Sequence, residues 1–363
     1  MFIIAHNGAR IWGGAEKATA LLLAGLQARG HRVLLFCNDA LVAERASAMG
    51  VPTEIVPLGG DLALGHAMRM AAALRRHRPD AFVIGTYRKL FLAALAASLA
   101  RVPRVIARVG LETDRPRSSK YRAALGRWVD AVVVNASRMR PAFLALPGWT
   151  EARVPVIHNG VHPPVCRLPP GAVRASLGIA PDSPVVGAIG RLAEQKHFHR
   201  LLRAVSILPL DVHCVLAGDG EEREALESLA RELAVAERAH FLGYRDDTGD
   251  VLDALDVFVV CSNREGLSNA MLEALAAGVP VVSTPVSGSD DALSPFPDGR
   301  APGMIVGFEA EEIAAALRHL LADRERLREM GGAARERAAT SFSVDGMLDA
   351  WEAVLAGEGG RGR

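Results

Sequence analysis

Short, wholly apolar runs alternate along this chain with longer stretches in which apolar residues recur every three or four positions. The apolar runs at residues 2–5 and 257–261 are typical of the chain: they have strand length and no polar interruption, which is the pattern of strands covered on both faces. The stretches between such runs are rich in helix formers. This alternation predicts an α/β fold with parallel sheets and covering helices.

The predicted elements fall into two sets, separated by the proline-rich stretch HPPVCRLPPG. We therefore expect a first domain at residues 1–163, a linker at 164–183 and a second domain at 184–342. Each domain should be a doubly wound, Rossmann-like unit, and residues 358–363 a flexible tail. The expected strands are 2–5, 33–37, 81–85, 104–109 and 131–134, then one from 184, and 212–217, 240–243, 257–261 and 304–306; the expected helices include 16–29, 198–208, 270–277, 310–321 and 343–355.

Composition excludes several classes of protein. The 363 residues suit two ordinary domains, and no apolar run is long enough to span a bilayer. The start, MFIIAHNG, lacks the basic and apolar regions of a signal peptide, so we expect a cytoplasmic protein. The four cysteines are scattered, without a CxxC pair, which argues against a disulfide framework or a zinc site.

Charge is unevenly distributed along the chain. Residues 1–163 contain 22 Lys and Arg against 10 Asp and Glu, whereas the remainder contains 20 against 31. The first half should therefore meet an anionic partner. No nucleic-acid motif or aromatic interleaving is present, so we expect an anionic membrane surface, at the cytoplasmic face of the inner membrane. The basic stretches at 68–78 and 118–129 are candidates for this contact, although an ordinary solvated helix face has the same pattern.

The segment at residues 256–284 carries the candidate chemistry. It predicts a buried strand, a polar turn, a helix beginning near Ser268 or Asn269, and a second buried strand. Backbone N–H groups of Gly266, Leu267 and Ser268 would lie at the helix start, where a phosphate can bind. Glu265 precedes this helix and Glu273 lies about two turns along it, on roughly the same side.

Other candidate residues also follow predicted strands. Gly13-Gly14 precedes a helix and lets a ligand approach the backbone, and Arg191 and Lys196 supply two cations beside another helix start. Because ligands of doubly wound sheets bind at the carboxyl ends of the strands, we expect these residues and Glu265 to face one cleft. Taken one at a time, each has an ordinary explanation. Gly13-Gly14 is typical of a tight turn, Arg191 and Lys196 are typical of solvated surface charges, and Glu265 is typical of a carboxylate that the helix dipole stabilises. Together they are suited to a diphosphate, whose departure the two cations would stabilise.

The motifs GGAE, VIHNGV, GRL…K, AGDGEERE, FLG and EGLSNAMLEALAAGVPVVS, in this order, resemble glycosyltransferase family 4. The resemblance runs over residues 7–355 and implies a retaining enzyme of the GT-B fold that uses a nucleotide-activated sugar. It implies that the terminal helix, at 343–357, packs back on the first domain. The donor-binding and catalytic residues that it implies are Arg191 and Lys196 with Gly190 for the diphosphate, Glu265 for the sugar hydroxyls, Glu273 for the ribose, amides of Gly266, Leu267 and Ser268 for the phosphates, Gly14 from the first domain, and Gly218, Tyr244 and Arg245 near the base.

One position departs from the family pattern. Many members have a His at the end of the strand at 104–109, whereas this chain has Gly110. Arg108 or Glu112 could take its place on the acceptor side, where Gly13 is also expected.

These observations predict a glycosyltransferase that moves a sugar, from a UDP-sugar above other donors, to a lipid-linked or lipopolysaccharide-type glycan. We expect no cofactor and no metal, because Asp246-Asp247 and Asp290-Asp291 should belong to surface turns. Two alternatives remain: a nucleotide-sugar-binding subunit without transferase activity, and a nucleotide-sugar epimerase of the same architecture. A nicotinamide dehydrogenase is disfavoured because the chain lacks the GxGxxG fingerprint.

Overall fold

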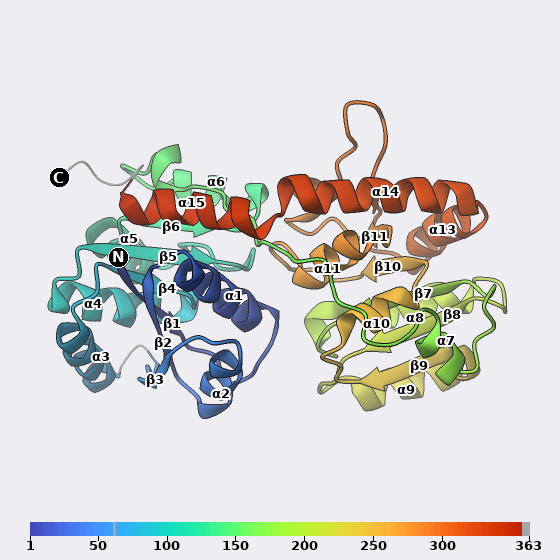
Figure 1. Ribbon diagram of the computed structural model, residues 1–363, viewed down its shortest axis with the longest axis horizontal. Coiled ribbons are helices and arrows are strands. Elements are labelled where there is room, and N and C mark those ends of the chain that lie inside the picture. Colours follow the sequence, from blue (N-terminus) through green and yellow to red (C-terminus); the bar gives the residue numbers. More distant parts are fainter. Residues whose placement is uncertain (61–62, 358–363) are drawn as a thin grey trace. The chain divides into compact units, whose positions relative to one another are not determined.

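The computed structural model describes residues 1–60 and 63–357, which form two compact units (Figure 1). The first unit comprises Met1–Gly160 together with the chain from Val344 onward, and the second comprises Val161–Ser343. The predicted tail at 358–363 lies outside the described residues.

The first unit is built on a six-stranded parallel sheet with the order β3-β2-β1-β4-β5-β6. Each face of the sheet has its own apolar core: one packs against α3, α4 and α5, and the other against α1, α2 and α15. The strands are β1 (Phe2–Asn7), β2 (Arg32–Cys37), β3 (Thr53–Ile55), β4 (Ala81–Ile84), β5 (Arg104–Val109) and β6 (Ala131–Val134), and the helices are α1 (Gly14–Ala28), α2 (Ala40–Ala48), α3 (Leu64–His77), α4 (Leu90–Ala100), α5 (Ser119–Trp128), α6 (Pro141–Leu144) and α15 (Val344–Ala356).

The second unit repeats this plan with the parallel order β12-β11-β10-β7-β8-β9. Its strands are β7 (Val185–Ile189), β8 (His213–Ala217), β9 (Ala239–Gly243), β10 (Val257–Val260), β11 (Val281–Ser283) and β12 (Gly303–Ile305), and its helices are α7 (Ala172–Ser176), α8 (Phe198–Ser206), α9 (Arg223–Glu232), α10 (Thr248–Asp253), α11 (Asn269–Ala277), α12 (Ser289–Leu293), α13 (Ala310–Leu321) and α14 (Arg324–Ser341).

Both sheets have one topology. Taken in chain order within each unit, the first strand lies between the second and the fourth, so the order of winding reverses between β1 and β4 and again between β7 and β10. This is the doubly wound arrangement, whose ligands bind beside the reversal at the carboxyl ends of the strands. The prediction of two doubly wound Rossmann-like units is therefore confirmed.

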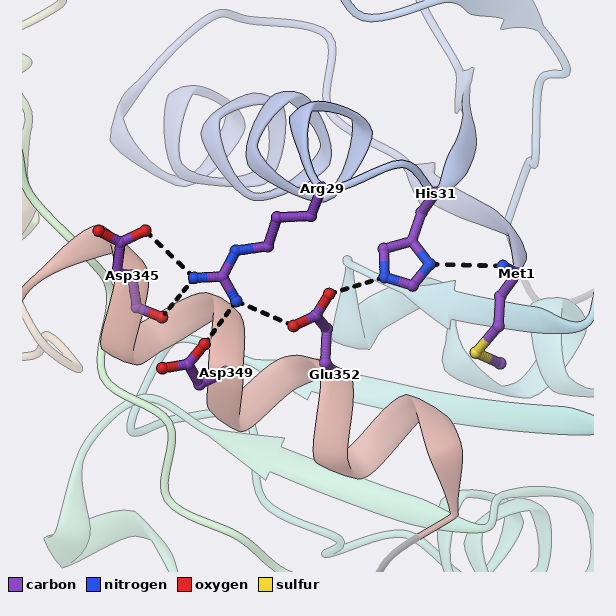
Figure 2. Close-up of polar contacts among 6 residues, drawn as sticks. All are labelled: Met1, Arg29, His31, Asp345, Asp349 and Glu352. Atoms are coloured by element: carbon purple, nitrogen blue, oxygen red, sulfur yellow. Dashed lines mark hydrogen bonds and ion pairs between the residues drawn. The ribbon is translucent and has the colours of Figure 1, made fainter.

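Helix α15 belongs to the first unit although it ends the chain (Figure 1). Its buried face includes Leu348 and Trp351, which pack in the core beside α1. At the edge of this contact Arg29 pairs with Asp345, Asp349 and Glu352 (Figure 2). Apolar burial and a charged rim together fix the helix to the unit in which the chain began.

The segment at 164–183, where we expected a linker, is attached to the second unit. The Asp250 carboxylate accepts hydrogen bonds from the backbone N–H groups of Arg167 (2.7 Å) and Leu168 (3.0 Å). Farther along, Arg174 pairs with Asp256 at 2.9 Å, and the segment forms α7. Hydrogen bonds from backbone N–H groups of this proline-rich segment to carboxylates hold it on the surface of the second unit.

Candidate functional site

The reversal point of the second sheet gathers several of the predicted residues. Strands β7 and β10 are hydrogen-bonded neighbours. Gly190 and Arg191 follow β7 directly, and the loop that leads to Glu265 follows β10. Both loops therefore emerge at the same carboxyl edge, as predicted for ligand-binding segments.

Lys196 and Glu265 make the central contact of this edge. The Lys196 Nζ donates a hydrogen bond to Glu265 Oε1, which also accepts one from the Ser262 hydroxyl at 2.8 Å. The side chains of Lys196 and Glu265 are only 19% and 9% exposed. A pair so shielded from water is held in one geometry, because either charge left alone there would be costly.

The loops that carry this pair are themselves tied down. The backbone N–H of Asn263 donates to the Gln195 carbonyl at 3.4 Å, which links the loop after β10 to the turn η4 (Glu194–Lys196). The Thr284 hydroxyl, at the end of β11, donates to the Ser262 carbonyl at 2.7 Å. Thr284 thus fixes the Ser262 backbone, and the Ser262 hydroxyl orients Glu265.

Helix α11 begins beside this pair. Ser268 is its N-cap and accepts a hydrogen bond from the Met271 N–H at 3.4 Å, while Gly266 and Leu267 are buried. The loop before the helix is held in place because the Gly288 N–H donates to the Gly266 carbonyl at 3.0 Å. No acidic residue lies in the first turn of α11, which leaves the positive end of the helix dipole suited to an anion.

Glu273 lies on α11, and Tyr244 and Arg245, expected near the base, follow β9. Glu273 is half-buried in the second turn of α11. Tyr244 is exposed, and Arg245 binds Asp247, with 2.7 Å between Nε and Oδ1. The Arg245 guanidinium holds the pKa of the Asp247 carboxyl below its usual range.

Gly218 and Gly190 bring two strand ends together. A Cβ at Gly218 would lie 1.9 Å from the Gly190 carbonyl oxygen, and Gly218 has a φ of 144°. Only glycine allows this approach of the loop after β8 to the loop after β7. Arg191, next to Gly190, is half exposed and pairs with Glu221 at 2.9 Å, apart from the Lys196–Glu265 contact.

In the first unit, Gly13 is the N-cap of α1 and Gly14 its first residue. The Glu16 carboxylate lies at the same helix start: it accepts from the Gly13 backbone, and burial raises its pKa. The expected place for a diphosphate thus already has a carboxylate beside it.

The two residues proposed to replace the family His have partners within the first unit. Arg108 donates to the Thr19 hydroxyl (2.7 Å) and to Asn159 (2.9 Å), and burial lowers its pKa to about 10. Glu112 pairs with Arg115 at 2.8 Å.

Comparison with known proteins agrees with this geometry. Residues 12–163 match the model described as Glycosyltransferase Family 4, and residues 171–337 match that of Glycosyl transferases group 1. The lipopolysaccharide core biosynthesis glycosyltransferase LpsD of Rhizobium meliloti is 31% identical over 287 residues, which cover 78% of this chain and 77% of the relative. The chain belongs to glycosyltransferase family 4.

Two further similarities fit this family. The lipopolysaccharide core biosynthesis glycosyltransferase LpsE of Rhizobium meliloti is 42% identical over 186 residues, half of this chain and 53% of LpsE; the match thus spans about half the length of that relative. The crystal structure of Anabaena HepE in complex with UDP-glucose has a TM-score of 0.85 at 22% identity and covers 98% of this chain and 99% of that one. The family and the GT-B fold that the motifs indicated are confirmed.

Sequence reasoning within the family missed the residues that support Glu265. Ser262 and Thr284 are uncharged and lie outside the motifs quoted above, yet their hydrogen bonds fix the loop that carries Glu265. The signal that could have found Ser262 is its position, three residues before Glu265 in the same polar turn.

Within residues 1–60 and 63–357, no group of three or more His, Cys, Asp and Glu side chains could hold a metal ion. None of the helices that the structure describes has the length and apolarity to cross a membrane.

Proposed function

We propose that this protein transfers a sugar from a nucleotide-diphosphate sugar to an acceptor hydroxyl, with retention of the anomeric configuration. The observation that carries the proposal is the largely shielded contact of Lys196 with Glu265, which Ser262 orients beside the start of α11. A cation, a carboxylate and helix N–H groups lie together there, and these are the groups that a sugar diphosphate needs.

The donor would lie along the carboxyl edge of the second sheet. The diphosphate would accept hydrogen bonds from Lys196, Arg191 and the N–H groups before α11, while Glu265 would accept from sugar hydroxyls. Glu273 would contact the ribose, and the base would lie near Gly218 and Tyr244. Support for UDP comes from HepE, a protein of the same fold crystallised with UDP-glucose.

In the proposed reaction a bond forms between the acceptor oxygen and the anomeric carbon, and the bond from that carbon to the diphosphate oxygen breaks. The acceptor proton passes to the departing phosphate oxygen. Arg191 and Lys196 would stabilise the charge that develops on the diphosphate, so the reaction needs no metal. This transition-state role separates the two cations from residues that only bind the donor.

We propose a cell-envelope glycan, lipid-linked or of lipopolysaccharide type, as the acceptor. LpsE and LpsD, whose names assign them to lipopolysaccharide core biosynthesis, support this choice. Helix α3 supports a membrane location: Leu64 and Met68 are 58% and 54% exposed beside Arg69. Apolar tips next to cations suit the surface of an anionic membrane.

A thermal-shift screen of UDP-, GDP- and ADP-sugars tests the donor. At 100 times its Kd a ligand stabilises the protein by about 2.7 kcal/mol, so a matching donor should raise the melting temperature clearly. Arg191→Ala should reduce this shift. Arg300→Ala is the matched control, because Arg300 is also half exposed and paired with carboxylates in the same unit.

A UDP-release assay with truncated lipopolysaccharide as acceptor tests transfer. Release that depends on the acceptor supports the proposal. Binding without turnover would instead favour a binding subunit, and an altered sugar formed without acceptor would favour an epimerase.

A further inference from the structure

Helix α8 carries an arginine that binds the loop after β10 on both sides of Ser262. Arg200 lies in the first turn of α8, and its Nη1 donates to the Cys261 carbonyl oxygen at 3.0 Å and to Asn263 Oδ1 at 2.6 Å. Cys261 and Asn263 flank Ser262, whose hydroxyl orients Glu265. Arg200 therefore holds the chain directly before and directly after the residue on which the geometry of Glu265 depends.

The Arg200 side chain is itself held in place. It is half-buried, and its Cζ lies 5.1 Å from the centroid of the Phe308 ring, in the loop between β12 and α13. A guanidinium is attracted to an aromatic face, and its planar shape directs its donors to fixed positions. The two hydrogen bonds to the loop are also charge-assisted, which makes each stronger than a bond between neutral groups.

The same helix begins next to Lys196. The Arg200 N–H donates to the His197 carbonyl at 2.9 Å, so the turn that carries Lys196 continues directly into the first turn of α8. Lys196 in turn pairs with Glu265. The loop after β7 and the loop after β10 are thus joined at two further places, by the Lys196–Glu265 pair and by Arg200.

A displacement of the loop after β10 would change the site in one respect. Lys196 is fixed to α8, whereas Glu265 follows the loop that Arg200 holds. Movement of this loop would therefore separate the carboxylate proposed for the sugar from the cation proposed for the diphosphate. We propose that Arg200 is a positioning residue that sets the place of Glu265 relative to Lys196, so that the site recognises the sugar of the donor as well as its diphosphate. This inference rests on the proposed function.

Two simpler roles of Arg200 predict different results. If Arg200 only stabilised the fold, its loss would lower the melting temperature and leave ligand recognition unchanged. If its positive charge attracted the diphosphate without a part for the two hydrogen bonds, its loss would weaken the binding of UDP itself. Positioning predicts that recognition of the sugar falls while binding of UDP is preserved.

Three variants and a control test the role of Arg200. Arg200→Met removes the charge and both hydrogen bonds but keeps a long apolar side chain. Arg200→Lys keeps the charge but is shorter and lacks the planar donors. Asn263→Ala removes one of the two acceptors without altering α8, so it tests the same contact if a change at Arg200 prevents folding. Arg203→Met is the matched control, because Arg203 is exposed about one turn farther along α8.

The first measurement is hydrogen exchange of the protein without ligand, followed in peptides that contain residues 261–268. Exchange there should be about fivefold faster in Arg200→Met and Arg200→Lys than in wild type, as expected for the loss of one or two hydrogen bonds, and somewhat faster in Asn263→Ala. Arg203→Met should exchange like wild type. Unchanged exchange in the Arg200 variants and in Asn263→Ala would show that Arg200 does not hold the loop, and the inference would be wrong.

The second measurement is titration calorimetry with UDP and with UDP-glucose, UDP-galactose and UDP-N-acetylglucosamine. For the UDP-sugar that wild type binds most tightly, the ratio of its Kd to that of UDP should rise about tenfold in both Arg200 variants, and the Kd of UDP should stay within about twofold. Arg203→Met should change neither value. Two results would overturn the inference: an unchanged ratio despite faster exchange, and weaker binding of UDP in Arg200→Met that Arg200→Lys restores.

Failure of the proposed function gives a different result. If the thermal-shift screen selects another nucleotide, the same ratio is measured with that nucleotide and its sugars. If no nucleotide sugar binds wild type, the proposed donor is wrong. Hydrogen exchange of the protein without ligand then decides by itself whether Arg200 fixes the loop that carries Glu265.

Discussion

Lys196 and Glu265, 69 residues apart in the chain, form a hydrogen-bonded ion pair that is largely shielded from water, with side chains only 19% and 9% exposed. Ser262 donates to the same carboxylate oxygen, so Glu265 has two fixed donors on Oε1. Breaking a buried pair from one side leaves a charge that water no longer solvates, whereas removing both charges is much less costly.

Comparison of a single with a double variant separates the structural role of this pair from its role in the reaction. We expect Lys196→Met to destabilise the protein by about 3 kcal/mol, and Lys196→Met with Glu265→Gln to recover most of that loss. Sugar transfer should stay at least about 100-fold below wild type in both variants, because the cation is absent from each. Urea denaturation and UDP release measure the two effects; activity that returned together with stability would contradict the catalytic role.

The approach of Gly218 to Gly190 predicts a second, purely steric effect. Gly218→Ala should cost about 3 kcal/mol, because a Cβ would overlap the Gly190 carbonyl oxygen and the backbone conformation disfavours a side chain. The strand end that carries Arg191 should shift, so the thermal shift given by UDP should also fall. Gly332→Ala, where a Cβ on α14 meets no atom within 4 Å, is the control and should be neutral or stabilising.

The strands were predictable because a strand covered on both faces is an uninterrupted apolar run. The structure has β5 and β6 at the predicted residues 104–109 and 131–134. Strand β3 was missed because it has three residues and none of them is buried. Helix α14 was missed because it is rich in Arg and Glu and lacks a broad apolar stripe; it packs through small residues such as Gly331, close to the Gly278 carbonyl.

The site was predictable only to the level of strand ends. That Lys196 and Glu265 should follow strands of one sheet could be read from the sequence, because both come just after apolar runs. Their direct contact, and the separate pairing of Arg191 with Glu221, depend on loop conformations that no periodicity encodes. Supporting hydroxyls such as Ser262 have no distinctive sequence signal at all.

The proposed mechanism predicts that transfer does not depend on a divalent cation. Arg191 and Lys196 would offset the charge of the departing diphosphate, and Asp247 is already paired with Arg245. Dialysis against EDTA should leave the rate of UDP release within about twofold, since the cationic side chains remain in place. Loss of activity that manganese restores would overturn this part of the mechanism.

His6 predicts a loss of stability in mild acid. Asn38 bonds the Leu58 backbone through both amide atoms, so its Oδ1 accepts from His6 Nε2 at 3.2 Å. Burial, with a smaller contribution from nearby Lys89, lowers the pKa of His6 to about 4, although the hydrogen bond to Asn38 acts in the opposite direction. An unfolded histidine has a pKa near 6.5. Between these values the unfolded chain binds a proton that the folded protein does not, so stability is complete above about pH 6.5 and falls as the pH drops towards 4.

The loss in free energy of unfolding that His6 causes in acid follows from the difference between its folded and unfolded pKa values, and is at most about 3 kcal/mol. His6→Gln keeps a donor for Asn38 but cannot be protonated, so its stability should change less between about pH 7 and pH 5. Urea denaturation at several pH values measures the slope. His319→Gln, at an exposed position on α13, is the control and should retain the wild-type slope; an unchanged slope in His6→Gln would show that other groups cause the acid sensitivity.

The attachment of α15 to the first unit should depend on its apolar face far more than on the charged rim in Figure 2. Trp351 is buried against the core, and Trp351→Ala should cost about 4 kcal/mol through lost burial and the cavity left behind. Arg29→Ala removes all three ion pairs, but Asp345 and Asp349 are largely exposed, so water replaces most of the interaction. The loss of stability caused by Arg29→Ala should therefore be small at low salt and should vanish at about 1 M salt, where exposed charges are screened. Thermal denaturation of both variants at low and high salt measures this ranking. An Arg29→Ala loss that equalled that of Trp351→Ala and persisted in high salt would show that the rim, rather than the apolar face, holds the helix.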